Sequence, residues 1–285
     1  MIKMVKTYIK YVHNPVKTVL KYLLLKRTVL KLKYYNFEFS IEKGRGEFTG
    51  LLNVLSNGWK IYDLKNTEYL FIHKAMKIKL IQPNLGALSE NLIEEYILPV
   101  KHLLENKNVI DVGGFFGETA IMFKKIGKCR KVFVFEPVPY HFQFLKRNII
   151  LNNFERDIKA FKRGVCKKRG KLIIESAEPV GKGAFGLEKG NHKVEIDCVS
   201  WKDLIKFAKK NKVEIIKVDC EGCEEGILTL SKEEIKSIPI WIIEIHNRSL
   251  LTKLWKKFKN AGFKLLFKKL LSENIHIVVF STKIK

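Results

Sequence analysis

The chain has 285 residues, of which 46% are hydrophobic and 29% are charged. This composition is close to that of an average globular protein and excludes a disordered, collagen-like or coiled-coil chain. The 54 Lys and Arg residues outnumber the 29 Asp and Glu residues, which gives a formal net charge of +25. A charge of this sign favours an anionic partner, such as nucleic acid, a phosphorylated substrate or a membrane surface.

The N-terminal segment 1–33 is predicted to contain a basic amphipathic helix. Asn14 is a suitable N-cap, and Pro15 suits the first helical position. An apolar stripe with helical spacing follows, and lysines lie off this stripe. The stripe consists of Val16, Val19, Leu20, Leu23 and Leu24. We expect it to pack either on the rest of the protein or on an anionic membrane surface or partner.

Residues 34–88 are predicted to form a small β-rich region, because short segments of alternating character are separated by turns. The expected strands are 34–41, 59–64, 68–73 and 76–81. A helix is predicted over 89–104, with a kink at Pro99. It leads into the main domain, which we place at 89–285.

From residue 108 onward, short hydrophobic strands alternate with helical stretches. The expected strands before the last pair are 108–112, 131–137, 158–161, 171–175, 193–199, 214–219 and 240–246. This order predicts an α/β fold with a Rossmann-like, doubly wound and mostly parallel sheet. The last two strands, 263–267 and 275–281, are joined too closely for a parallel crossover. We therefore expect an antiparallel pair that closes the sheet.

The cysteines and the apolar segments indicate the compartment. The five cysteines lack the dense spacing of a secreted disulfide scaffold, which favours a reducing environment. We expect neither a membrane-spanning run nor a signal peptide, because no apolar stretch is long enough and lysines interrupt residues 1–33. The expected location is cytoplasmic, or peripheral at the inner membrane surface.

The strongest single motif is the segment 109–119, an apolar strand that runs through glycines into a helix. Gly113 and Gly117 allow a tight turn and a close approach to a ligand, which helix-terminal N–H groups would face. A dinucleotide fingerprint would need a glycine where Phe115 stands. Glu136 ends the next strand, where a carboxylate can accept hydrogen bonds from both ribose hydroxyls. Together these features predict a nucleotide-like cofactor site.

Two later strands also end in polar residues. Asp219 ends the strand 214–219, and Glu221 and Glu224 follow it. Glu244 and His246 share one face of the next strand. The carboxyl edge of an open α/β sheet is where ligands bind, so these groups are candidates for the chemistry.

At these positions the sequence resembles the FkbM family of S-adenosylmethionine-dependent methyltransferases. The resemblance extends over 94–247. Its most specific pieces are D-V-G-G-F-F-G at 111–117, F-E-P at 135–137, N-I-I-L-N at 148–152, K-V-D-C-E-G-C-E at 217–224 and I-E-I-H at 243–246. It implies a class I methyltransferase fold and O-methylation of hydroxyls on glycans, lipids and natural products. The departure from the family pattern is Phe115, where members usually have an Asn-like polar residue.

The resemblance also implies S-adenosyl-L-methionine as the cofactor, with Glu136 on its ribose and Asp219 near its reactive methyl group. The residues expected at the cofactor are Asp111, Gly113, Gly114, Gly117, Glu136, Pro137 and Asp219.

A neutral alcohol is a weak nucleophile and needs a positioned base or a metal. His246 is the expected base because histidine titrates near neutral pH. Asp219 and Glu221 are expected to orient it or to hold Mg²⁺. A divalent metal is a weaker expectation than the base, and we assign no metal ligands.

Two alternative functions and the role of one segment remain open from the sequence. The net charge suits an RNA methyltransferase, although no RNA-binding motif and no N/D-P-P-Y/F box is visible. A non-catalytic protein that binds a membrane surface or nucleic acid on a methyltransferase scaffold is the other alternative function. The glycine-rich segment 180–190 is either a lid over the site or a plain surface hairpin.

Overall fold

The computed structural model describes residues 6, 8–10, 12–24, 27–31, 38–42, 54–64, 68–83, 92–176, 192–271 and 273–283. Contacts divide the chain into two compact units, Met1–Asn91 and Leu92–Lys285. The division lies close to the predicted boundary at residue 88. None of the helices in the described ranges has the length and apolar character that a membrane crossing requires.

In the first unit, helix α2 (Pro15–Leu24) starts directly after Asn14, as predicted. It is followed by the antiparallel pair β1 (Arg27–Lys31) and β2 (Glu38–Glu42), so the expected boundary at residue 33 falls inside a hairpin. A second antiparallel sheet contains β3 (Trp59–Asp63), β4 (Tyr69–His73) and β5 (Ile78–Gln82). The predicted β-rich region is thus two small sheets.

The apolar stripe of α2 is exposed. Four of its side chains are 54–80% exposed and Val19 is 39% exposed. Within the described residues of its own unit the stripe is therefore uncovered, and both expectations for its partner stay predictions.

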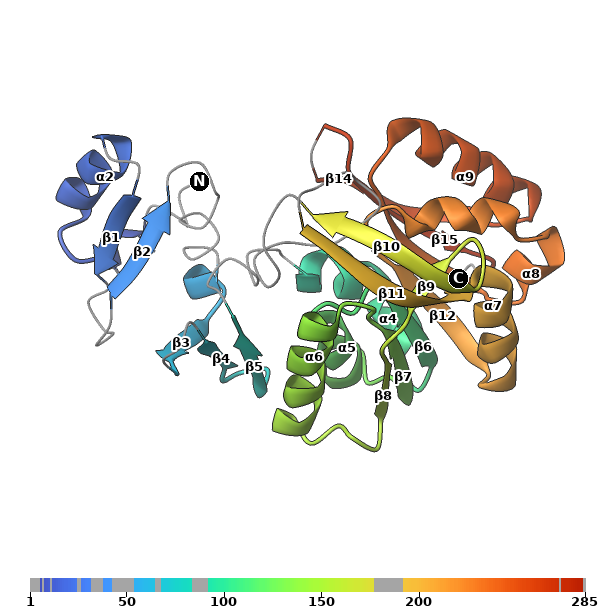
Figure 1. Ribbon diagram of the computed structural model, residues 1–285, viewed down its shortest axis with the longest axis horizontal. Helices are drawn as coiled ribbons and strands as arrows, with labels where there is room; N and C mark the ends of the chain where they lie inside the picture. Colours follow the sequence, from blue (N-terminus) through green and yellow to red (C-terminus); the bar gives the residue numbers. More distant parts are fainter. Residues whose placement is uncertain are drawn as a thin grey trace. The chain divides into compact units, whose positions relative to one another are not determined.

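The second unit is built on a seven-stranded sheet in the order β14-β15-β13-β12-β6-β7-β8 (Figure 1). Its strands are β6 (Asn108–Val112), β7 (Lys131–Phe135), β8 (Ile158–Phe161), β12 (Val213–Val218), β13 (Ile240–Ile245), β14 (Lys264–Leu270) and β15 (His276–Ser281). Five of these strands are parallel, and β15 runs antiparallel between β13 and β14. This topology confirms the Rossmann-like prediction with its antiparallel last strand.

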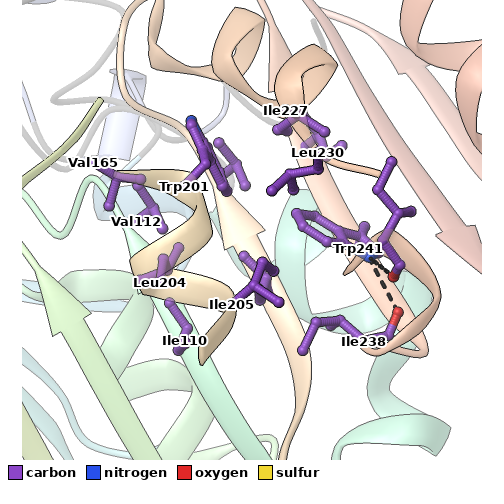
Figure 2. Close-up of a cluster of buried hydrophobic side chains, with 14 of the residues drawn as sticks. Ile110, Val112, Val165, Trp201, Leu204, Ile205, Ile227, Leu230, Ile238 and Trp241 are labelled. Atoms are coloured by element: carbon purple, nitrogen blue, oxygen red, sulfur yellow. Dashed lines mark hydrogen bonds between the residues drawn. The ribbon is translucent and has the colours of Figure 1, made fainter. Parts of the chain in front are cut away.

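Helices cover both faces of this sheet (Figure 1). They are α4 (Lys101–Leu104), α5 (Glu118–Lys125), α6 (Pro139–Leu151), α7 (Trp201–Lys210), α8 (Lys232–Lys236) and α9 (Arg248–Asn260). Residues of α7, α8 and α9 bury one face in a single apolar cluster. Figure 2 shows its centre, with the buried Trp201 at the start of α7 and the buried Trp241 on β13, whose indole N–H donates to the backbone carbonyls of Ile235 and Ile238. This core holds the strands, and hence their polar carboxyl ends, in fixed register.

Two expectations for this unit need correction. The helix predicted over 89–104 is instead η1 (Ile93–Ile97), η2 (Leu98–Val100) and α4, because Pro99 has no N–H to continue the hydrogen-bond ladder. The strands expected at 171–175 and 193–199 are β10 (Gly170–Ser176) and β11 (His192–Ser200), which form a separate sheet with β9 (Gly164–Cys166). The glycine-rich segment 180–190 lies outside the described residues.

The cysteines are also not all reduced. One disulfide joins Cys166 of β9 to Cys198 of β11, and another joins Cys220 to Cys223 after β12. Cys129 is buried and free. The expectation of a reducing environment therefore has no support from the structure.

Candidate active site

The glycine turn joins β6 to α5 and packs closely on its neighbours. Gly113 has a φ of +81°, and a Cβ there would lie 1.6 Å from the carbonyl oxygen of Asp219. A Cβ on Gly114 would lie 2.2 Å from Val134. Gly117 has a φ of +92° and precedes the first residue of α5. Only glycine therefore allows the turn to sit this close to β7 and to the end of β12.

Glu136 ties this turn to the end of β7. Its carboxylate accepts hydrogen bonds from the N–H of Phe115 at 2.8 Å and the N–H of Val138 at 2.9 Å. Phe115 adopts a left-handed backbone, with φ at 46°, and its ring packs on Phe116 and His141. The side chain of Phe115 is therefore part of an aromatic cluster, while its backbone orients Glu136.

A buried ion-pair network lies beside the turn, centred on Lys217 of β12. Its Nζ is 3.1 Å from Asp111 and 3.3 Å from Asp219, and it donates to the carbonyl of Gly113. Asp111 also accepts a hydrogen bond from Thr119 at 2.6 Å and is fully buried. Burial alone would lower the pKa of Lys217, but the carboxylates of Asp111 and Asp219 outweigh it, so the pKa is raised. Lys217 thus links the ends of β6 and β12 as a fixed cation.

Tyr96 of η1 closes one side of this network. Its hydroxyl lies in hydrogen-bond contact with Glu244 and 3.2 Å from Asp219. The ring of Tyr96 lies under the ammonium group of Lys217, 5.2 Å from the centroid. The residues that precede the main sheet thus contribute directly to the site.

His246 is surrounded by three carboxylates. Its Nδ1 lies 2.7 Å from Glu224, and its Nε2 lies 3.1 Å from Glu244 and 3.4 Å from Glu221. Glu224 is fully buried and also accepts the N–H of Gly222 at 2.7 Å. The imidazole is thus hydrogen-bonded through Nδ1 and faces two further carboxylates at Nε2.

This arrangement determines the protonation of the site. Burial by itself lowers the pKa of His246, but hydrogen bonds from its ring to Glu224 and Glu244 outweigh it and raise the pKa to about 11. Burial raises the pKa of Glu221 to about 7, although the charge of His246 opposes the rise. At neutral pH the site therefore holds an imidazolium next to a carboxyl group that titrates.

The same cluster has donors for a cation. Ligand atoms of Asp219, Glu221 and His246 lie within 4.8 Å of one another. An imidazole must be neutral to bind a metal, so a cation would have to displace the proton that the carboxylates hold.

The structure brings Asp219, Glu221 and His246 together, and places Gly113, Gly114, Gly117, Glu136 and Pro137 at the neighbouring strand ends. Sequence reasoning did not select Lys217 or Tyr96. Lys217 is a lone lysine inside the apolar strand 213–218. This position was a usable signal, because a buried lysine needs carboxylate partners. Tyr96 carried no comparable signal.

Comparisons with known proteins place the sequence among methyltransferases. A family model described as a methyltransferase FkbM domain matches residues 111–265. A structure of the methyltransferase FkbM from Methylobacillus flagellatus is 20% identical, with a TM-score of 0.45, and the match covers 62% of this chain and 44% of that one. A candidate tRNA methyltransferase from Streptococcus pneumoniae is 14% identical, with a TM-score of 0.44, and the match covers 69% and 72% of the two chains. A methyltransferase from Pyrococcus furiosus is 17% identical, with a TM-score of 0.40, and the match covers 69% and 85%. A search of curated proteins found no match.

Proposed function

Because the chain belongs to the FkbM methyltransferase family, we propose that it methylates a hydroxyl group of a glycan, a lipid-linked sugar or a related metabolite. The observation that carries this proposal is the convergence of the glycine turn, Glu136 and the carboxylates around His246 at the carboxyl edge of the sheet.

The residues at the ends of β6 and β7 fit S-adenosylmethionine, which supplies an electrophilic methyl group on a sulfonium. Each carboxylate oxygen of Glu136 accepts one backbone N–H, and Oε1 also lies 3.4 Å from Nδ1 of His141, so Oε2 is the oxygen that keeps a lone pair for a ribose hydroxyl. Gly113, Gly114 and Pro137 would shape the backbone on either side. Asp111 would act as a positioning residue, because its carboxylate is already engaged by Lys217 and Thr119.

We assign the proton acceptor to Glu221. Its pKa of about 7 means that a substantial fraction is ionised at neutral pH while it keeps enough basicity to accept a proton from an alcohol. The side chain is 36% exposed, so an acceptor can reach it. Asp219, beside it on the same turn, would help to orient the acceptor hydroxyl.

The prediction of His246 as the base fits this geometry less well. An imidazolium with a pKa of about 11 has no free lone pair at neutral pH. Its fixed positive charge instead holds Glu221 and Glu244 in place and balances the negative charge of the cluster.

RNA is the second candidate acceptor, because the net charge of +25 suits a phosphate backbone. Retention of bulk tRNA at ~0.15 M salt, together with methyl transfer to it, would favour RNA. Loss of binding at that salt concentration would favour the smaller acceptor.

Thermal unfolding with S-adenosylhomocysteine tests the cofactor assignment. A ligand that binds only the folded state at ~100 times its dissociation constant stabilises it by ~2.7 kcal/mol. We expect this stabilisation in the native protein and its loss in Glu136→Ala. The control Glu195→Ala removes an exposed glutamate of β11 that pairs with Lys171, and it should respond like the native protein. No response of the native protein would favour a non-catalytic binding protein.

A further inference from the structure

A groove of about 460 Å³ lies between α9 and the strands β14 and β15. Six of the eight residues that line it are basic or aromatic, and the other two are Leu251 and Thr252. The residues that give it this character are Arg248, Trp255, Lys256, Lys259, Lys268 and His276. Its volume lies within the ~300–1,000 Å³ of small-molecule sites.

The positive charge of the groove is not balanced by protein. No carboxylate lines it, and neither α9 nor β14 contains an acidic residue. In the part of the chain that the structure describes, Arg248, Lys256, Lys259 and Lys268 form no ion pair with a carboxylate, whereas the neighbouring Lys269 pairs with Glu95 at 3.0 Å. Cations that converge without partners attract an anion.

Two further side chains point to a ligand rather than to a solvated basic face. His276 is only 6% exposed, and its Nδ1 has no hydrogen-bond partner among the described residues, although a buried polar atom normally has one. Trp255 is 41% exposed and lines the same groove, where it offers an aromatic face. A buried unsatisfied nitrogen beside an exposed indole is the arrangement of a binding site for a molecule with both polar and flat or apolar parts.

The groove and the candidate active site share one segment of the chain. Arg248 follows His246 by two residues, and His276 pairs in the sheet with Ile245, the residue that precedes His246. Both therefore lie at the carboxyl end of β13.

We propose that this groove binds the phosphate or diphosphate group of the methyl acceptor. The inference rests on the proposed function and narrows its substrate to a phosphorylated small molecule. Arg248, Lys256, Lys259 and Lys268 would contact the phosphate oxygens, His276 would complete the polar contacts, and Trp255 would cover an adjoining base, sugar or lipid portion. A nucleotide-linked sugar and a lipid-linked sugar share this diphosphate chemistry.

Equilibrium binding of inorganic pyrophosphate to the full chain is the direct test. We expect binding in the native protein and a weakening of at least tenfold in Lys256→Gln/Lys259→Gln, since charge-assisted contacts to phosphate are lost. The matched control is Lys253→Gln/Lys257→Gln, which makes the same charge change on α9 outside the groove and should bind like the native protein. Equal weakening in both double variants, or no binding to the native protein, would overturn the proposal.

Two further probes identify the source of the diphosphate. Uridine diphosphate and a short isoprenyl diphosphate are each competed against pyrophosphate. Competition by either compound supports a diphosphate site in the groove. The compound that binds more tightly indicates whether the acceptor is nucleotide-linked or lipid-linked. A single-stranded RNA that binds but is not displaced by pyrophosphate would contradict it. The response to S-adenosylhomocysteine separates this proposal from the proposed function. A stabilised protein that binds no diphosphate refutes only the groove. A protein that binds diphosphate without a response to S-adenosylhomocysteine keeps an anion site but refutes its assignment to a methyl acceptor.

Discussion

At the scale of single residues, the surroundings of Glu221 predict how methyl transfer depends on pH. Glu221 must be ionised to accept a proton, so the rate should rise as pH increases through about 7 and then level off. Replacement by Gln should lower kcat by ~10²–10⁴-fold and leave the affinity for S-adenosylhomocysteine unchanged. The measurement is the pH profile of methyl transfer from labelled S-adenosylmethionine.

The control for this prediction is Glu225→Gln. Glu225 lies in the same turn region but pairs with Lys167 outside the cluster, so its removal should leave both the rate and the profile intact. A Glu221→Gln variant with the native rate would end the assignment of Glu221 as proton acceptor.

Lys217 allows a prediction about stability. Its removal leaves Asp111 as an uncompensated buried charge, and breaking one partner of a buried pair costs ~3–5 kcal/mol. Lys217→Met should therefore lower the free energy of unfolding, measured with urea, by about that amount. Lys283→Met breaks an exposed pair with Glu214 and should cost only ~0–1 kcal/mol. Equal losses in the two variants would show that the network around Lys217 does not stabilise the fold.

At the scale of elements, periodicity and turn residues were enough to predict the parallel core and its antiparallel end. β6, β7, β12 and β13 are buried runs followed by glycine or polar residues, and each of these signals is local in sequence. For the cluster around His246, the sequence predicted only that polar residues at neighbouring strand ends lie close together. Its protonation depends on Glu224 and Glu244, which the fold brings to opposite sides of one ring. Tyr96 reaches Glu244 across 148 positions of the chain, and no local pattern carries that information.

Helix α2 predicts a measurable interaction with membranes. Its exposed apolar stripe is flanked by Lys17 and Lys21, a combination that binds anionic lipid surfaces. We expect the chain to sediment with phosphatidylglycerol-containing vesicles and Leu20→Glu to reduce this binding. The control Ile150→Glu places the same charge at an exposed apolar residue of α6 and should sediment like the native protein. Identical sedimentation of both variants would remove α2 from membrane binding.

At the scale of the whole molecule, the family match and the proposed site residues lie in one of the two units. The family match at 111–265 lies inside Leu92–Lys285, and so do Glu136, Glu221, His246 and the basic groove. However, the family match begins after Tyr96. The hydroxyl and the ring of Tyr96 contact the ion-pair network. We therefore expect the unit that binds the cofactor to extend beyond the part that the family model covers.

Two fragments test this boundary. A fragment of residues 92–285 keeps Tyr96 and should show the same thermal stabilisation by S-adenosylhomocysteine as the full chain. A fragment of residues 101–285 loses Tyr96, the partner of Glu244, and Glu95, the partner of Lys269. Because buried partners are lost, this fragment should unfold at a lower temperature. Tyr96→Phe in the longer fragment separates the hydroxyl from the rest of η1, since it removes the hydroxyl contacts to Glu244 and Asp219 and keeps the ring. If 92–285 failed to bind S-adenosylhomocysteine while the full chain bound it, the first 91 residues would be part of the catalytic unit, because only they differ between the two proteins.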